Sequence, residues 1–241
     1  MPNIPELTAF RKNPPKVCFA QGRLFFTIHY KVKDNAFKRA AETWQKEVKL
    51  EEHFIPGHDV FIAKEVKNEA EFKAAWAEMA QTAQRKKLTV WAGNLLTHAW
   101  KDEESGDRGL EFRPVPEKED GALRQAEIAV LEKLPWNNDY GYLILSGCNT
   151  GMIGQRGWTP AQAFAQRQQI ITVGQKGFAY FSEKWEIYDR ISDKDQKIYL
   201  WAYERSENLS WWAALRLRIR ATVYQPPRAS KCGSILKGKT R

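Results

Sequence analysis

The chain has 241 residues, of which 43% are hydrophobic and 28% are charged, the composition of an ordinary globular protein with a sizeable core. No apolar run approaches the ~20 residues that a membrane-spanning helix needs, so we expect no membrane partner. The net charge of +9 permits binding to nucleic acid, but no zinc-finger spacing or aromatic RNA-binding signature accompanies it, so the charge alone does not indicate a nucleic-acid partner.

The first half of the chain alternates between strand and helix patterns. Residues 1–16 are rich in proline and asparagine and predict an extended arm. Three runs rich in β-branched and aromatic residues predict strands, and the stretches between them carry apolar residues at helical spacing, with Asp34 and Asn68 placed to cap the two helices. Strands joined by helical crossovers imply right-handed βαβ units and a parallel sheet. The strands are expected at residues 22–31, 58–64 and 88–96.

The second half is expected to continue the same layers. One helix is predicted over residues 123–134, and another begins at Pro160, directly after the capping residue Thr159. The sequence therefore predicts one three-layer α/β/α domain with a mostly parallel central sheet over residues 17–227. The other expected segments are a polar loop (101–108), a short strand (109–113), a charged linker (114–121), strands at 142–145, 170–173 and 177–181, an extension from about residue 183, and a basic tail (228–241).

A cysteine lies at the carboxyl end of strand 142–145, within Ser146-Gly-Cys-Asn-Thr-Gly151. In open α/β sheets this edge is where reactive groups meet ligands. His98 follows strand 88–96 in the same way, and a neighbouring imidazole activates a thiol that is otherwise largely protonated. Cys148 and His98 are therefore the candidate nucleophile and base. The glycines that follow Cys148 would let backbone N–H groups approach an oxyanion closely.

The run 143–151 resembles the nucleophile segment of the caspase-like cysteine peptidases (clan CD). It is closest to the bacterial CHAT branch related to separase, in which a hydrophobic strand ends in Ser-Ala-Cys-Asn-Thr-Gly. The strand before His98 resembles the family's histidine segment, and the 50 residues from His98 to Cys148 suit the family's His-before-Cys order. The resemblance covers roughly residues 22–182.

The resemblance implies a caspase-like fold and a thiol protease that cleaves protein substrates through an acyl-enzyme. Cys148 would be the nucleophile, His98 the general base and acid, and the backbone N–H groups of Ala99 and Cys148 the oxyanion hole. Two positions depart from the family pattern: Ala99 stands where the family commonly has glycine, and Gly147 stands where it usually has alanine.

The substrate pocket is expected at the strand ends beside the cysteine. Its candidate residues are Asp34 or Asn35 after the first strand, Ser146, and Gln175 in a turn over 172–177. A pocket for arginine or lysine needs a buried acid and a pocket for aspartate needs a basic group, and residues of both kinds are close in sequence. The dense aromatic residues after position 178 either line a substrate groove or fill the second half of the core.

These features lead to three alternatives for the function. The first is a cysteine endopeptidase without cofactor or metal, acting on a protein substrate as a bacterial toxin, effector or defence protease. The second is a non-catalytic caspase-like module that binds protein through the same cleft, which the departure at Ala99 motivates. The third is a basic nucleic-acid-binding protein. Three widely spaced cysteines and an N-terminus without a signal-peptide pattern favour the cytoplasm, or export without a cleavable signal peptide.

Overall fold

A computed structural model describes residues 21–33, 35–101, 107–112, 121–153, 157–175, 178–182, 199–203 and 221–224. Its centre is a six-stranded sheet with the order β11-β8-β7-β3-β1-β2. Within this sheet, the five strands that come first along the chain pair in parallel with their neighbours. The sixth strand, the last along the chain, pairs antiparallel with β8. The strands are β1 (Arg23–Tyr30), β2 (Val60–Val66), β3 (Thr89–Leu96), β7 (Tyr142–Ser146), β8 (Ile171–Gln175) and β11 (Ala221–Tyr224).

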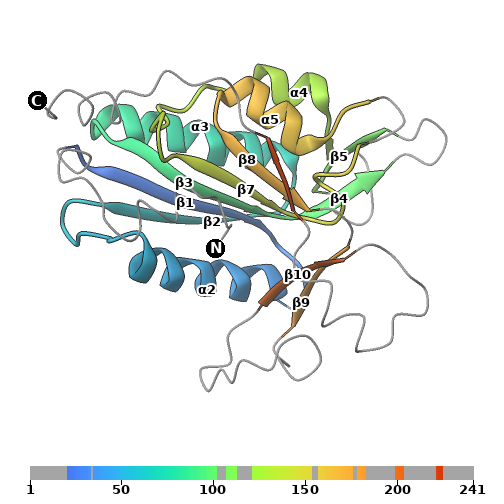
Figure 1. Cartoon of the computed structure of the whole chain (residues 1–241), viewed down its shortest axis with the longest axis horizontal. Helices are drawn as coiled ribbons and strands as arrows, with labels where there is room; N and C mark the ends of the chain where they lie inside the picture. Colours follow the sequence, from blue (N-terminus) through green and yellow to red (C-terminus); the bar gives the residue numbers. More distant parts are fainter. Residues whose placement is uncertain are drawn as a thin grey trace, which may run out of the picture.

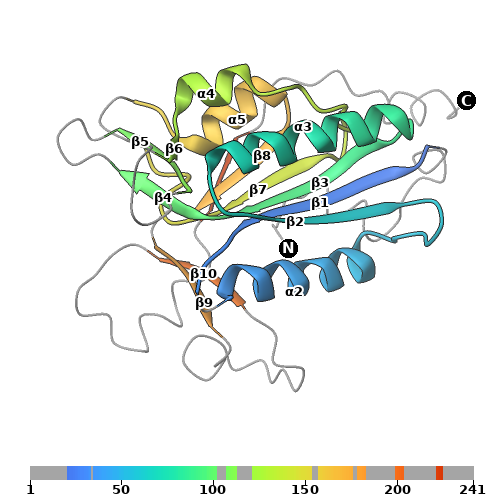
Figure 2. The same ribbon diagram turned by 180° about the vertical axis from the view of Figure 1, so that it is seen from behind.

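Helices cover both faces of this sheet. Among the described elements, α2 (Ala36–Glu51) lies on one face, and Figure 1 shows α3 (Glu69–Arg85), α4 (Gln125–Val130) and α5 (Pro160–Gln168) on the other. The reverse view in Figure 2 shows the same separation into layers. The prediction of a three-layer α/β/α fold with a mostly parallel central sheet is therefore confirmed.

Two small antiparallel sheets complete the described elements. The first consists of β4 (His98–Lys101), β5 (Arg108–Glu111) and β6 (Ala122–Leu123), and it continues directly from the end of β3. The second is the pair β9 (Phe178–Ser182) and β10 (Tyr199–Tyr203). The aromatic residues after position 178 that were considered as a groove or as core have side chains outside the described part of the chain.

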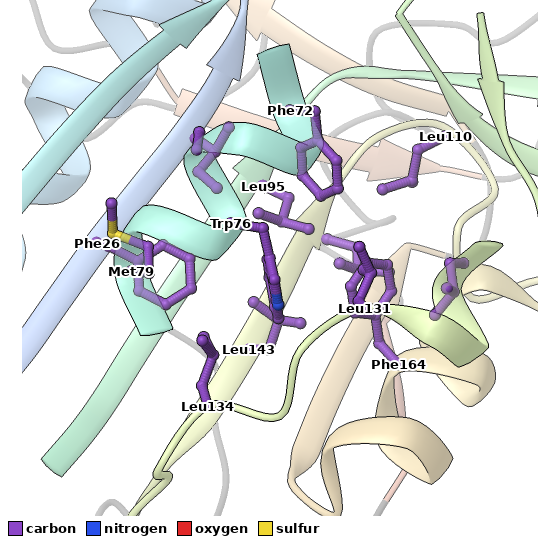
Figure 3. Close-up of a cluster of buried hydrophobic side chains, with 14 of the residues drawn as sticks. Phe26, Phe72, Trp76, Met79, Leu95, Leu110, Leu131, Leu134, Leu143 and Phe164 are labelled. Carbon is purple, nitrogen blue, oxygen red and sulfur yellow. The ribbon is translucent and has the colours of Figure 1, made fainter. Parts of the chain in front are cut away.

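The larger hydrophobic core lies between the sheet and the helices α3, α4 and α5. Figure 3 shows Phe72, Trp76 and Met79 of α3 among side chains from the sheet and from α5. Trp76 is fully buried, and its ring lies edge-on to Phe26 with the ring centroids 5.8 Å apart. Asn68 accepts a hydrogen bond from the Glu71 amide at 2.8 Å, which confirms it as the cap of α3.

A buried ion pair fixes the opposite, amino end of the strands. Arg23 is fully buried at the start of β1, and its guanidinium binds the carboxylate of Asp59. It also donates to the Glu52 carbonyl at 2.9 Å and stacks on the Trp91 ring, 5.0 Å from its centroid. Burial alone would raise the pKa of Asp59, but hydrogen bonds from Arg23 and from the Ile55 amide hold that pKa below its ordinary value.

Four local predictions are wrong. The capping position of α2 is Asn35 in a left-handed conformation rather than Asp34, which lies outside the described residues. Both ends of the polar loop expected over 101–108 belong to strands, because Lys101 of β4 pairs with Arg108 of β5. Residues 172–175 belong to β8 and form no turn, because all four pair with β11 and residues 172–174 also pair with β7.

The fourth wrong prediction is the helix expected over residues 123–134. Leu123 pairs with Leu110 in a sheet, and α4 covers only Gln125–Val130. The segment that follows is extended, and side chains distant in sequence satisfy its backbone. The Glu132 carbonyl accepts from the Trp76 indole and from the Gln168 amide, both at 2.9 Å. An extended segment with such partners buries its apolar residues as well as a helix would.

Candidate functional site

The strand order places a change of direction at the centre of the sheet. From β1 the chain passes to β2 on one side and then to β3 on the other, with α2 and α3 on opposite faces. In doubly wound sheets the crevice outside the carboxyl ends of strands at this point is the usual ligand site. The carboxyl end of β3 lies there, followed by Thr97 and His98, with β7 as its other neighbour.

Cys148 lies in a tight turn just after β7. It is the one cysteine of three within the described residues, and it is a half-buried thiol. Asn149 after it adopts a left-handed conformation with φ 56°, which asparagine tolerates better than most residues. The turn therefore changes the chain direction immediately after the thiol, and the side chain is held at the strand end.

Thr150 joins this turn to the sheet. Its buried hydroxyl lies 3.0 Å from the carbonyl oxygens of both Leu145 and Gly147, and it accepts a hydrogen bond from the Gln175 amide at 3.0 Å. The Gly151 amide donates to the Gln175 carbonyl at 2.9 Å. The backbone on both sides of Cys148 is thus fixed to β7 and to the end of β8.

Gly147 brings the cysteine segment against the histidine segment. A Cβ atom at this position would lie 2.7 Å from the Thr97 carbonyl oxygen, much closer than real side chains approach. Leu96 pairs with Ser146 in the parallel ladder. One further step along the two strands brings Thr97 beside Gly147, and the next step leads to His98 and Cys148. The two candidate catalytic residues therefore follow adjacent strands at the same edge of the sheet.

His98 is exposed, and aromatic side chains flank its ring. The Phe37 ring at the start of α2 lies 5.0 Å away and the Tyr30 ring at the end of β1 lies 6.2 Å away, measured between centroids. Both contacts are edge-to-face. The backbone beside His98 is fixed by Thr97, whose hydroxyl donates to the Glu111 carbonyl at 2.5 Å.

The backbone groups predicted to form an oxyanion hole follow the same two strands. Ala99 is the second residue of β4 and pairs with Leu110 of β5. Cys148 belongs to the turn described above. The departure from glycine at position 99 fits its place in this regular strand, where alanine adopts the backbone conformation without strain.

The predicted pocket residues have different positions. Ser146 is fully buried and its hydroxyl donates to Asn94 Oδ1 at 2.7 Å, so it supports the strand end instead of offering a substrate contact. Gln175 is 2% exposed and belongs to β8, which also removes it from the surface. Asp34 lies outside the described residues. Both side chains are internal in the described structure, and the substrate pocket stays a prediction.

Sequence reasoning missed Asn94 and Arg108. Asn94 is buried on β3 and binds Ser146 across the ladder, and its signal was a polar residue inside the apolar run 88–96. Arg108 begins β5 with a half-buried guanidinium, and nothing local in the sequence marks it. Asn94 lies two residues before the end of β3, and Arg108 pairs with Lys101 at the end of β4 away from His98.

The described part of the chain contains no cluster of three or more histidine, cysteine, aspartate or glutamate side chains suited to a metal ion. In the same residues, no helix is both long and apolar enough to cross a membrane. No protein-family model, no curated protein and no solved structure matches this chain.

Proposed function

We propose that the protein is a cysteine endopeptidase with Cys148 as nucleophile and His98 as general base and acid. The parallel pairing of β3 with β7, in which Leu96 lies beside Ser146, is the observation that carries this proposal. Both residues follow these strands at the carboxyl edge of the sheet, and β3 borders the point between β1 and β3 where the strand order reverses, near which ligands bind in such folds. The resemblance of the cysteine segment to bacterial CHAT peptidases gives the reaction type, and toxin, effector or defence roles follow from the same resemblance.

The chemistry requires two steps at this edge. The Cys148 thiolate, formed by proton transfer to His98, attacks the carbonyl carbon of the scissile peptide. The C–N bond breaks as His98 returns the proton to the leaving amine, and water then hydrolyses the thioester with His98 as base. The developing oxyanion needs backbone donors, for which Ala99 and Cys148 are the candidates.

Selective alkylation of the thiol tests the proposal. The full chain is treated with iodoacetamide near neutral pH, and the rates at Cys18, Cys148 and Cys232 are measured by mass spectrometry. An activated thiol is alkylated faster than an ordinary one, because thiolate is the reactive species. We expect Cys148 to react at least about tenfold faster than the other two, and His98→Ala to remove the difference. Equal rates at all three cysteines would contradict the assignment.

A matched histidine variant controls for general effects of the substitution. His53 is exposed in a turn with φ 51°, and His53→Asn suits that conformation. We expect this variant to keep the Cys148 rate. Peptidase activity itself is measured as new peptide termini in a peptide library, and Cys148→Ala should abolish them while circular dichroism stays unchanged.

A non-catalytic binding module is the second candidate, and the packing of His98 favours it. A ring held edge-on by Phe37 and Tyr30 has contacts typical of a structural histidine. In that case Cys148 is alkylated no faster than an ordinary thiol, and the peptide library gains no new termini. The same two measurements therefore separate the candidates.

A further inference from the structure

Strand β2 forms one edge of the central sheet, and among the described strands it has a neighbour on one side only. The N–H and C=O groups of such an edge can pair with another chain, so proteins usually interrupt it with a proline, a bulge or a charge. The seven residues of β2 include no proline, and their register with β1 continues without a shift. The β2 edge is therefore regular along its whole length.

The backbone of β2 turns alternate residues toward β1 and away from it. The Val66 carbonyl accepts a hydrogen bond from the Lys31 amide at 2.8 Å, so Val66 faces β1, as does every second residue before it. The residues between them direct their N–H and C=O groups out of the sheet, where the described part of the chain provides no further strand. These residues are Phe61, Ala63 and Glu65.

The chain itself closes both ends of this outward row. The Lys67 amide donates to the Glu71 carboxylate at 2.8 Å. At the other end, the Asp59 amide donates to the Ile55 carbonyl, also at 2.8 Å. The free part of the edge is therefore a row of three outward residues with Ala63 at its centre, and Ala63 is exposed.

The two charged side chains of β2 do not protect this edge, because each is paired within the chain. Lys64 Nζ lies 2.7 Å from Glu78 Oε1 of α3. Glu65 Oε1 lies 3.1 Å from Lys31 Nζ at the end of β1. A strand that approaches β2 therefore meets two neutralised pairs, although the whole chain has a net charge of +9.

We propose that the β2 edge binds the β2 edge of a second copy of this chain, antiparallel about a two-fold axis at Ala63. In this register Ala63 lies opposite its own copy and Phe61 lies opposite Glu65, so all the free groups of both edges are used in about six hydrogen bonds. A second copy fits better than an unrelated strand, because the free row is symmetric about its middle residue and alanine leaves the axis uncrowded. The interface does not rest on the peptidase proposal, since β2 carries none of the candidate catalytic residues.

Sedimentation velocity of the full chain over a range of concentrations tests the dimer. One pair of strands is a small interface, so we expect a dissociation constant of about 1–100 µM. Ala63→Lys and Ala63→Glu each bring like charges together at the axis and should weaken dimerisation at least about tenfold. An equimolar mixture of the two variants should dimerise again, because opposite charges then face each other.

A matched variant and a second measurement control for effects of the substitution on folding. Ala129→Lys makes the same change at an exposed position of α4, which lies beside α5 and away from β2 (Figure 1), and it should dimerise like the wild type. Hydrogen exchange of the unmodified chain, followed by NMR, needs no substitution. The protection of the amides of residues 61, 63 and 65 should rise with protein concentration.

Several results would overturn this interface. One is a wild-type chain that stays monomeric up to about 1 mM, and another is a dimer that Ala63→Lys leaves unchanged. A mixture of the two charged variants that stays monomeric would exclude the two-fold axis at Ala63. Protection of the three amides that does not depend on concentration would mean that another part of the same chain occupies the edge, which also contradicts the proposal.

Discussion

Gly147 limits how close the cysteine and histidine segments can approach. The position in front of the nucleophile tolerates no Cβ, because the Thr97 carbonyl oxygen would lie 2.7 Å from it and Thr150 Cγ2 3.2 Å. The alanine usual at this position in the peptidases that the cysteine segment resembles therefore does not fit this backbone without a shift. Glycine at position 147 is the local consequence of how tightly β3 and β7 meet at their ends.

We predict that Gly147→Ala lowers the free energy of unfolding by roughly 1–3 kcal/mol, the usual cost of forcing an extra methyl group into a packed site. The same substitution moves the Cys148 turn away from Thr97 and slows alkylation of the thiol. Urea unfolding gives the first quantity, and the iodoacetamide rate gives the second. If Gly147→Ala has the free energy of unfolding and the alkylation rate of the wild type, the two strand ends can accommodate an extra methyl group, and the prediction is wrong.

His29, on the sheet face covered by α2, makes the stability of the protein depend on pH. It is 5% exposed, and neither ring nitrogen has a hydrogen-bond partner among the described residues. Burial lowers its pKa below 6.5, and Lys38 adds to this lowering, whereas Glu65 and Glu42 oppose it. Glu65 Oε2 lies 3.9 Å from Nε2, too far for a hydrogen bond. Folding therefore disfavours the protonated form of this imidazole.

The sign of the effect on stability follows from proton binding. Below about pH 6.5 the unfolded chain takes up a proton at His29 that the folded chain does not, so stability decreases as the pH falls. The decrease reaches at most about 1.4 kcal/mol per pH unit, until the folded pKa is reached. We expect His29→Gln to remove this part of the pH dependence in urea unfolding and His53→Asn to keep it. Parallel pH profiles for the wild type and His29→Gln would contradict the role.

At the scale of elements, one side chain provides hydrogen bonds to the extended segment that follows α4, where a helix was expected. Gln168 of α5 is 4% exposed, and its Oε1 accepts from the Leu134 amide at 3.0 Å and from the Trp136 indole at 3.2 Å. Its Nε2 donates to the Glu132 carbonyl at 2.9 Å. Three polar groups of the extended segment after α4 thus depend on one amide that is 32 to 36 residues away in sequence.

We predict that Gln168→Leu lowers the free energy of unfolding by about 3 kcal/mol, since it leaves buried donors and an acceptor unsatisfied. Gln166→Leu makes the same chemical change at an exposed position of the same helix and should alter stability by less than ~0.5 kcal/mol. Denaturant unfolding of the two variants measures the difference. If both lose the same amount, the cost comes from helix propensity or solubility and not from the buried amide.

This contrast also explains which elements the sequence predicts. The helices α3 and α5 carry their own signals, the caps Asn68 and Thr159 followed by apolar stripes, and both caps bind as expected. The helix expected over 123–134 fails, because the partners that favour an extended chain, Trp76 and Gln168, are distant in sequence. Local signals predict local structure, and the exceptions are positions where distant side chains satisfy the backbone.

The candidate site divides in the same way. The position of Cys148 and His98 at one edge of the sheet could be predicted, because parallel strands have their carboxyl ends at the same edge. That β3 and β7 are neighbours could not, because β2 and β3, which are also consecutive, are separated by β1. The burial of Ser146 against Asn94 could not, because it depends on the register of β3 and β7. The hydrogen bond from the Trp158 indole to Asp107 could not be predicted either, because no pattern in the sequence reveals it.

At the scale of the whole molecule, one edge strand of the central sheet, β11, comes from late in the sequence. The helix and strand patterns after residue 183 could not be placed in the fold from the sequence, yet β11 pairs antiparallel with β8 along residues 172–175. Gln175, whose backbone also holds the Cys148 turn through Thr150 and Gly151, pairs with Ala221. The end of the chain is therefore connected to the candidate site through one strand.

Two truncations isolate the contribution of that strand. A chain that ends at Tyr224 keeps β11, and a chain that ends at Arg220 lacks only its four residues. Loss of the ladder leaves the edge of β8 unpaired, which removes hydrogen bonds worth roughly 2–4 kcal/mol in total and exposes an edge prone to aggregation. We expect the shorter chain to be less stable by about that amount in urea unfolding and to aggregate at lower concentration in light scattering.

Because Gln175 is the common partner of β11 and of the Cys148 turn, the shorter chain should also lose the selective alkylation of Cys148 while the longer one keeps it. If the two truncated chains are equally stable and are alkylated alike, β11 contributes neither to the stability of the sheet nor to the reactivity of Cys148. If stability falls but selective alkylation persists, the turn around Cys148 is held by β7 and Thr150 alone, and the site is independent of the end of the chain.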